Sequence, residues 1–348
     1  MKVITPGRIC LFGEHQDYLG LPVIALAISL NSSISLTKRK DKKIIINMPD
    51  LDRVEEFSLD DLSYSKDRDY FKSAMNVCLK EGLKFSNGFE SIIESNIPIQ
   101  AGTSSSSSIV VGWINLISKI ADNPPNWNNE IIARLAYQAE VLEFDEPGGM
   151  MDQYTTAIGG CIYLDQQPFS VKQLQPKLKT FVLGNSNQPK DTMTILKRCR
   201  DQRISIMEKL NTIYPDVSFN NCSDEHGKSI LNHEEQALLE GTIENREILF
   251  QGIKELQKNE IDHNRIGQLL SDHHEVLRDK LKVSTEKIDN MIEASINAGA
   301  LGAKVNGSGG GGCMFAYAPK NSNDIASAIE NAGGTAHIIH ADDGTRID

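Results

Sequence analysis

The chain lacks the features that mark several common protein classes. Its 348 residues include six cysteines, none of them in a Cys-x-x-Cys pair. This wide spacing fits neither a zinc site nor a small disulfide framework, so we expect reduced thiols. No apolar run approaches the roughly 20 residues of a membrane-spanning helix, and the N-terminal segment meets proline, glycine and charge too early for a signal peptide. We therefore expect a soluble, cytoplasmic protein with no membrane partner.

Positive charge is also scarce, since 36 Lys and Arg face 47 Asp and Glu, for a formal net charge of -11. Nucleic-acid binding through phosphates requires clustered Lys and Arg, so we expect no nucleic-acid partner. A small anionic ligand remains compatible with this charge, because backbone N–H groups can bind it locally.

The chain has the length of one large or two ordinary domains. Segments rich in β-branched residues, such as KKIIINM, dominate the first half, and long charged segments with helical spacing dominate the second. We expect an α+β protein of two lobes, residues 1–170 and 171–348.

A run of five serines interrupts the sequence IPIQAGTSSSSSIVVG at residues 97–112. Serine runs are typical of flexible linkers, and a serine at the start of a helix is often only a cap. Here the run follows Pro98 and Gly102 and precedes an apolar segment long enough for a buried helix. That order also suits a loop whose backbone N–H groups bind a phosphate. It is not a Walker A motif, because GxxxxGK[ST] is absent.

Two further places concentrate polar residues. Arg8, Glu14, His15 and Asp17 lie within ten residues, in RICLFGEHQD, which suits recognition of several hydroxyl groups but also suits a charged turn. Asp152 follows the glycine- and methionine-containing segment EPGGMM, where a carboxylate is either a helix cap or a positioned acid–base group.

A glycine-rich segment, NGSGGGGC, occupies residues 306–313. It can form a tight hairpin, or it can close on a phosphate.

Together these stretches resemble the GHMP kinase superfamily and, within it, the galactokinase branch. PGRICLFGEHQDYLG resembles the family's first motif, and PIQAGTSSSSS is similar to its phosphate loop. EPGGMMDQYTTAIGG resembles the segment with the catalytic aspartate, and GAKVNGSGGGGCMFAY resembles the third motif. The resemblance runs in order along the whole chain. It implies a two-lobed fold of mixed sheets and helices, with the active site in the cleft between the lobes.

The resemblance also implies roles for individual residues. Asp152 would be the catalytic carboxylate, with Arg8 beside it to keep it ionised. The sugar would contact Glu14, His15, Asp17 and Gly149. The ATP phosphates would lie on Gly102, Thr103, Ser104, Ser105, Ser106, Ser107 and Ser108. Ser106 and Glu140 would bind Mg²⁺ through hard oxygen ligands.

The implied activity is ATP- and Mg²⁺-dependent phosphorylation of the anomeric hydroxyl of a monosaccharide, with galactose as the leading candidate. Arabinose, a galactosamine derivative, fucose or a heptose are alternative acceptors, and a non-catalytic sugar- and ATP-binding sensor is a different class of protein. GEHQDY suits polyol recognition and disfavours mevalonate or homoserine. A monomer or small homo-oligomer is expected.

The phosphate loop departs from the family pattern at two positions. Gln100 replaces a usual glycine, and Thr103 replaces a usual leucine. We expect these changes to affect how the loop fits a nucleotide.

Overall fold

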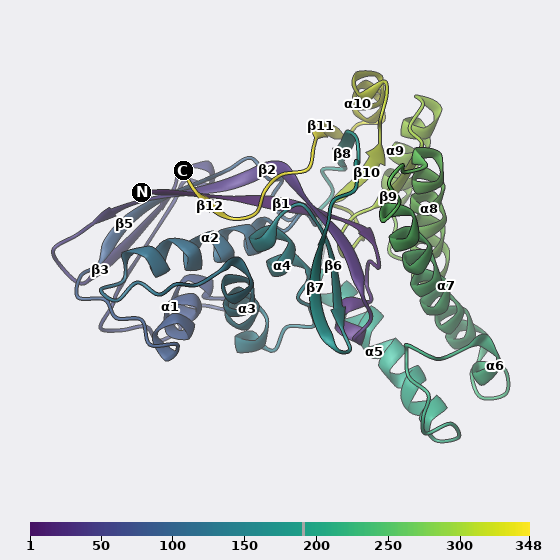
Figure 1. Ribbon diagram of the computed structural model, residues 1–348, viewed down its shortest axis with the longest axis horizontal. Coiled ribbons are helices and arrows are strands. Elements are labelled where there is room, and N and C mark those ends of the chain that lie inside the picture. The colour runs from purple at the N-terminus through teal and green to yellow at the C-terminus, as the bar shows by residue number, and fades with distance from the viewer. Residues whose placement is uncertain (190–191) are drawn as a thin grey trace.

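The computed structural model describes residues 1–189 and 192–348 and confirms the α+β class. Figure 1 shows a broad first lobe and, beside it, a second lobe rich in long helices. The C-terminus returns to the first lobe, where it lies close to the N-terminus. No helix among the described residues has the length and apolarity required to cross a bilayer. All six cysteines are buried.

The first lobe is built on an eight-stranded sheet. Its strands are β1 (Lys2–Phe12), β2 (Val23–Lys38), β3 (Lys43–Met48), β4 (Arg53–Ser58), β5 (Phe89–Ser95), β6 (Cys161–Gln166), β7 (Phe169–Leu174) and β12 (Arg346–Ile347). The main order is β12-β1-β2-β5-β3-β4, and β6 and β7 extend the sheet from the first half of β2. The pairing of β3 with β5 is parallel, and the others are antiparallel. The lobe boundary predicted at residue 170 falls within β7 and stays a proposal.

Helices cover one face of this sheet (Figure 1). They are α1 (Tyr70–Lys80), α2 (Ser105–Ile120), α3 (Asn129–Glu140) and α4 (Met151–Ile158), with single turns at η1 (Asp17–Leu19), η2 (Pro49–Leu51) and η3 (Leu142–Phe144). The apolar segment after the serines forms α2, as predicted. Its Trp113 is fully buried and packs against Phe71 and Phe89, with ring centroids at 4.9 and 5.3 Å.

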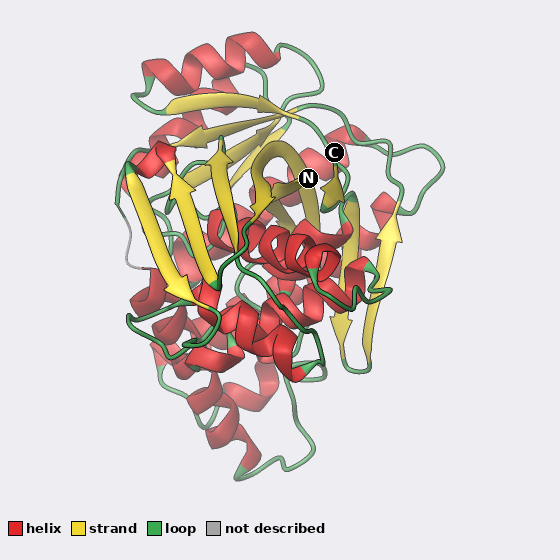
Figure 2. Ribbon diagram, turned by 90° about the vertical axis from the view of Figure 1, so that its left-hand side faces the viewer, coloured by secondary structure: helices red, strands yellow, loops and turns green. Residues whose placement is uncertain are grey.

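The second lobe contains an antiparallel four-stranded sheet in the order β11-β8-β10-β9. These strands are β8 (Phe181–Asn185), β9 (Gly302–Val305), β10 (Cys313–Tyr317) and β11 (Thr335–Ile339). Its helices are α5 (Thr192–Asn211), α6 (Asp224–Gly227), α7 (His233–Leu256), α8 (His263–Glu275), the π-helical turn η4 (Val276–Lys280), α9 (Glu286–Asn297) and α10 (Ser322–Asn331). Figure 2 shows the two sheets as separate groups of strands, each with helices packed against it.

Strand β1 joins the two hydrophobic cores, because side chains on a strand alternate between its faces. Ile9 and Leu11 belong to the core of the second lobe, whereas Cys10 belongs to that of the first. Val3, which precedes the register shift between Pro6 and Gly7, also belongs to the core of the first lobe. The polar residues that follow β1 therefore emerge where the lobes meet.

Candidate active site

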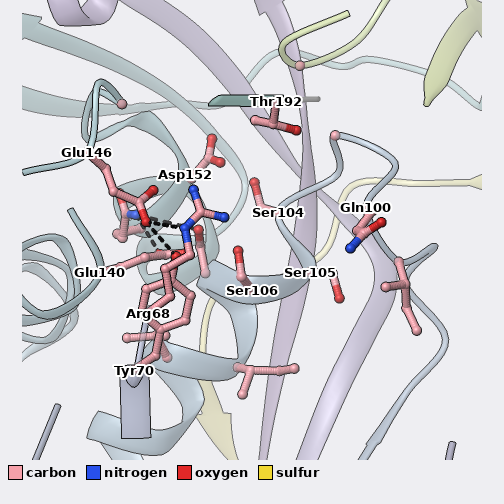
Figure 3. A pocket seen from close by; sticks show the side chains of 18 of the residues that line it. Arg68, Tyr70, Gln100, Ser104, Ser105, Ser106, Glu140, Glu146, Asp152 and Thr192 are labelled. Carbon is pink, nitrogen blue, oxygen red and sulfur yellow. Dashed lines mark hydrogen bonds and ion pairs between the residues drawn. The ribbon is translucent and has the colours of Figure 1, made fainter. Parts of the chain in front are cut away.

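A cavity of about 510 Å³ lies where β1, the predicted phosphate loop (residues 98–108) and the segment before α4 come together. Figure 3 shows side chains that line it. The cavity brings most of the predicted site residues into one place. The predicted residues that line it are Arg8, Glu14, His15, Asp17, Gly102, Ser104, Ser105, Ser106, Ser107, Glu140, Gly149 and Asp152.

Thr103 and Ser108 do not line the cavity. Thr103 is fully buried, and its carbonyl oxygen accepts a hydrogen bond from the Arg8 backbone N–H at 3.2 Å. The Ser108 hydroxyl donates to the Ser105 carbonyl oxygen at 2.9 Å. The Thr103 hydroxyl donates to the Pro98 carbonyl oxygen at 3.4 Å, so both side chains form hydrogen bonds within the loop.

Arg8 and Asp152 form an ion pair at the wall of the cavity. Nε and Nη2 of Arg8 lie 2.8 and 2.7 Å from Oδ1 of Asp152. Burial lowers the pKa of Arg8, but the charges of Asp152 and Glu14 outweigh it, so this pKa lies above its ordinary value. Arg8 is 4% exposed, whereas the Asp152 side chain is 31% exposed. Asp152 thus faces the cavity, in the first turn of α4, with a fixed cation behind it.

Asp17 occupies the adjoining part of the cavity and has no cationic partner among the described residues. It is 6% exposed and accepts hydrogen bonds from the backbone N–H groups of Tyr18 (2.9 Å) and Met151 (3.3 Å). Burial, followed by the charge of Asp152, raises the pKa of Asp17 to about 6. A Cβ atom at Gly149 would lie 2.0 Å from Asp17 Oδ2. Only glycine therefore allows the backbone at residue 149 to approach this carboxylate so closely.

Glu14 and His15 line the cavity but also connect the two lobes. Oε2 of Glu14 accepts hydrogen bonds from Lys304 Nζ at 3.1 Å and from the Gly307 backbone N–H at 2.9 Å. Nε2 of His15 lies 3.0 Å from the Ser308 carbonyl oxygen, and because a carbonyl can only accept, this nitrogen donates. These contacts fix the first motif against the glycine-rich turn, and sugar binding by both residues stays a prediction.

Glu140, at the end of α3, is a buried carboxylate beside the serine loop. It accepts a hydrogen bond from Gln153 Nε2 at 2.7 Å, and the side chains of Ser106 and Ser107 are close enough to influence its pKa. Burial raises the pKa of Glu140 to about 7, against the lowering effect of the polar groups of Gln153, Ser106 and Ser107.

The donor set of Glu140 and Ser106 fits Mg²⁺, which binds hard oxygen ligands and retains waters and phosphate oxygens. No group of three or more His, Cys, Asp or Glu side chains within residues 1–189 and 192–348 could hold a metal ion by itself. Phosphate oxygens and water would therefore have to complete the coordination.

The phosphate loop combines a helix N-terminus with an unusual backbone. Gln100, Gly102 and Ser104 alternate with other residues and all have positive φ, at 53°, 81° and 62°. Alternating left-handed residues curve a loop so that its N–H groups converge on an anion, and the first turn of α2 adds unpaired N–H groups. The Ser104 hydroxyl is buried and has no hydrogen-bond partner within residues 1–189 and 192–348. The loop therefore has the chemistry of an anion cradle.

The glycine-rich turn between β9 and β10 packs directly on this loop. Asn306 Nδ2 donates to the Gly102 carbonyl oxygen at 2.7 Å, and Asn306 Oδ1 accepts from the Cys10 backbone N–H at 2.9 Å. A Cβ atom at Gly307 would lie 2.6 Å from the Gly102 carbonyl oxygen, which only glycine avoids. The turn is thus a hairpin loop that holds the phosphate loop and the first motif together.

Sequence reasoning missed several residues that organise the cavity. Lys304 is fully buried, and the sequence indicated it only as a lysine within an apolar strand. Arg203, on α5, donates to the Tyr18 hydroxyl. Arg68 Nε pairs with Glu146 at 2.7 Å at the cavity wall (Figure 3). These partners lie far apart in the chain, so no local motif indicated them.

Comparison with known proteins identifies similar families over most of the chain. Residues 69–160 match the GHMP kinases N terminal domain, residues 253–335 match the GHMP kinases C terminal domain, and residues 3–38 match the galactokinase galactose-binding signature.

Two kinds of relative are similar at nearly the same level. A mevalonate kinase of Thermococcus gammatolerans is 31% identical over all of this chain and 99% of its own length. A galactokinase of Clostridium perfringens is 30% identical over 94% of this chain and 88% of its own length.

Solved structures of both kinds share the fold. Lactococcus lactis galactokinase complexed with galactose superposes with a TM-score of 0.86 at 23% identity, covering 99% of this chain and 94% of that one. Methanococcus jannaschii mevalonate kinase superposes with a TM-score of 0.77 at 22% identity, covering 99% and 98%.

Proposed function

Because the chain belongs to the GHMP kinase superfamily, we propose that it transfers the terminal phosphoryl group of ATP to the anomeric hydroxyl of a monosaccharide, with galactose as the first candidate. The choice of acceptor rests on Asp17, which is a buried carboxylate without a cationic partner among the described residues.

The charge around Asp17 favours a neutral acceptor with hydroxyl groups. Arg8 is paired with Asp152, and Lys304 is paired with Glu14, so neither cation compensates Asp17. A sugar hydroxyl can donate to the free lone pairs of this carboxylate and so offset the cost of its burial. An anionic acceptor would instead add a like charge close by.

In the proposed reaction, the acceptor hydroxyl lies against Asp152. The acceptor oxygen bonds to the γ-phosphorus as the bond from phosphorus to the β–γ bridging oxygen breaks, so that ADP leaves. Asp152 takes the proton of the acceptor hydroxyl, and Arg8, which is paired with Asp152, offers positive charge beside the transferring group. Phosphoryl transfer depends mainly on positioning and charge stabilisation, which these residues can supply.

On the donor side, the phosphates of ATP are proposed to lie on the loop of residues 102–107 and the first turn of α2. Ser106 and Glu140 would hold Mg²⁺, which neutralises phosphate charge when bound. We place this reaction in the cytoplasm, where ATP is available and buried thiols stay reduced.

Mevalonate is the second candidate acceptor, because the mevalonate kinase of T. gammatolerans is as similar to this chain as the C. perfringens galactokinase. Mevalonate carries a carboxylate at neutral pH. Its binding would therefore require a cation that faces the acceptor, and Asp17 opposes it.

The test is release of ADP from ATP and Mg²⁺ in the presence of galactose, arabinose, N-acetylgalactosamine, fucose, a heptose or mevalonate, with Asp152→Asn as the inactive control. We expect galactose to support turnover and mevalonate to fail. Turnover with another sugar alone would replace the substrate but keep the sugar kinase. Turnover with mevalonate alone would overturn the sugar assignment, and ligand-induced stabilisation without any turnover would indicate a sensor.

The Asp17→Asn variant sharpens this choice. It should lower kcat/KM for the sugar, because the strong acceptor of its hydroxyl hydrogen is lost. If mevalonate is the natural acceptor, the same change should instead preserve or improve turnover, because it removes a repulsive charge.

A further inference from the structure

Gln100 has a strained backbone at the edge of the phosphate loop. Its φ is 53°, in the left-handed region that non-glycine residues seldom adopt, and the residue is exposed and lines the cavity. Glycine would take this conformation without steric cost. Such strain tends to persist at ligand sites, where the side chain or the backbone geometry has a use.

The side-chain amide of Gln100 has no hydrogen-bond partner among the described residues. Figure 3 shows it at the opposite side of the cavity from Glu140, with its amide directed toward the start of α2, where Ser104 and Ser105 lie. Its NH₂ group is therefore a donor available to whatever occupies the space over the loop.

A second feature of the same loop also indicates that the loop binds a hydrogen-bond acceptor. The Ser104 hydroxyl is buried and has no partner in the part of the chain that the structure describes, on a residue that is 6% exposed and lines the same cavity. Buried hydroxyl groups are normally hydrogen-bonded. Together with the alternating positive φ angles at residues 100, 102 and 104, this hydroxyl points to an anion that accepts from the loop.

We propose that the Gln100 side-chain amide is a nucleotide-binding group that donates a hydrogen bond to the polyphosphate chain of ATP. This inference rests on the proposed function, because it requires the phosphates of ATP to lie on the loop. The strained conformation is retained because it directs the amide over those phosphates, where a glycine would offer only its backbone.

The test compares Gln100→Glu and Gln100→Gly with the unchanged protein, and uses Gln175→Glu, in an exposed segment outside the cavity, as the control for added negative charge. The dissociation constant of a non-hydrolysable ATP analogue with Mg²⁺ is measured by calorimetry, and the thermal midpoint is measured without ligand. Neither readout requires turnover.

The Gln100→Glu variant retains size and backbone strain but replaces the donor with a charge that repels phosphate. We expect its dissociation constant to rise roughly tenfold or more, since hydrogen bonds to charged groups are among the stronger ones, while the thermal midpoint and the control stay unchanged. The Gln100→Gly variant should bind the analogue more weakly and unfold at a higher temperature, because strain is removed together with the donor.

Equal nucleotide affinity of Gln100→Glu and the unchanged protein would overturn the inference and leave the proposed function intact. A Gln100→Gly variant that gains stability and keeps full affinity would overturn it in the same way. If the unchanged protein binds no ATP analogue, both the inference and the proposed function fail.

Discussion

Replacing Asp17 with asparagine should stabilise the unliganded protein while weakening acceptor binding. The carboxylate is almost fully buried, and burial raises its pKa from 3.8 to about 6. Each pKa unit corresponds to about 1.4 kcal/mol, so ionised Asp17 costs the folded state about 3 kcal/mol at neutral pH. Asparagine removes this cost but loses the hydrogen bond from the Met151 N–H, at about 1 kcal/mol. The net expected gain is about 2 kcal/mol.

The pH dependence of the stability gain distinguishes an effect of the Asp17 charge from an effect of packing. The folded-state pKa lies above the unfolded value, so between pH 3.8 and about 6 the folded state binds more protons. The cost of Asp17 is therefore absent below pH 3.8 and complete above pH 6. The Asp17→Asn variant should be more stable than the unchanged protein at pH 7.5 and should lose that advantage at pH 4.

Urea-induced unfolding followed by circular dichroism at both pH values measures the difference, with Asp60→Asn as an exposed control. A variant that is less stable at pH 7.5, or a difference that is the same at both pH values, would refute the reasoning. Either result would mean that the charge of Asp17 is compensated in the folded protein.

Three further outcomes are expected. Asp152→Asn should lower kcat by ~10²–10⁴-fold, the usual contribution of a positioned acid–base group, and leave ATP affinity measured by calorimetry unchanged; a near-normal rate would remove Asp152 from the chemistry. Gly149→Ala should raise the KM of the acceptor and not that of ATP, because its Cβ would lie 2.0 Å from Asp17 Oδ2; an unchanged acceptor KM would contradict this. Burial lowers the pKa of His274 to about 4, although Asp289 opposes the shift, so the free energy of unfolding should fall as pH drops from 6.5 toward 4. Replacing His274 with glutamine should flatten that decline in urea unfolding, and an unchanged decline would contradict this prediction.

Local sequence patterns predicted the elements that hold the site but not all of their limits. The apolar segment after the serines forms α2, and the glycine-rich segment joins two antiparallel strands. The apolar segment LPVIALAISL and the alternating segment NSSISLTKRK lie in one continuous strand, β2, from Val23 to Lys38. The first part of β2 pairs with β6 and the last part with β5, and this change of partner could not be read from either segment alone.

The contacts that organise the cavity could not be predicted because they join distant parts of the chain. Glu14 is held by Lys304, 290 positions away. A motif places Glu14 near the end of β1, but it gives no information on which cation approaches from the other lobe. The structure accounts for the two departures in the phosphate loop: Gln100 has a positive φ, which a glycine adopts without strain, and Thr103 is buried away from the cavity.

The most direct test of the central claim is ³¹P NMR of the product formed from ATP, Mg²⁺ and an equimolar mixture of galactose and mevalonate. If a neutral polyol lies between Asp17 and Asp152, the new resonance should be that of galactose 1-phosphate, with phosphorus bonded to the anomeric oxygen. Formation of a phosphorylated mevalonate, with galactose unchanged, would contradict the account.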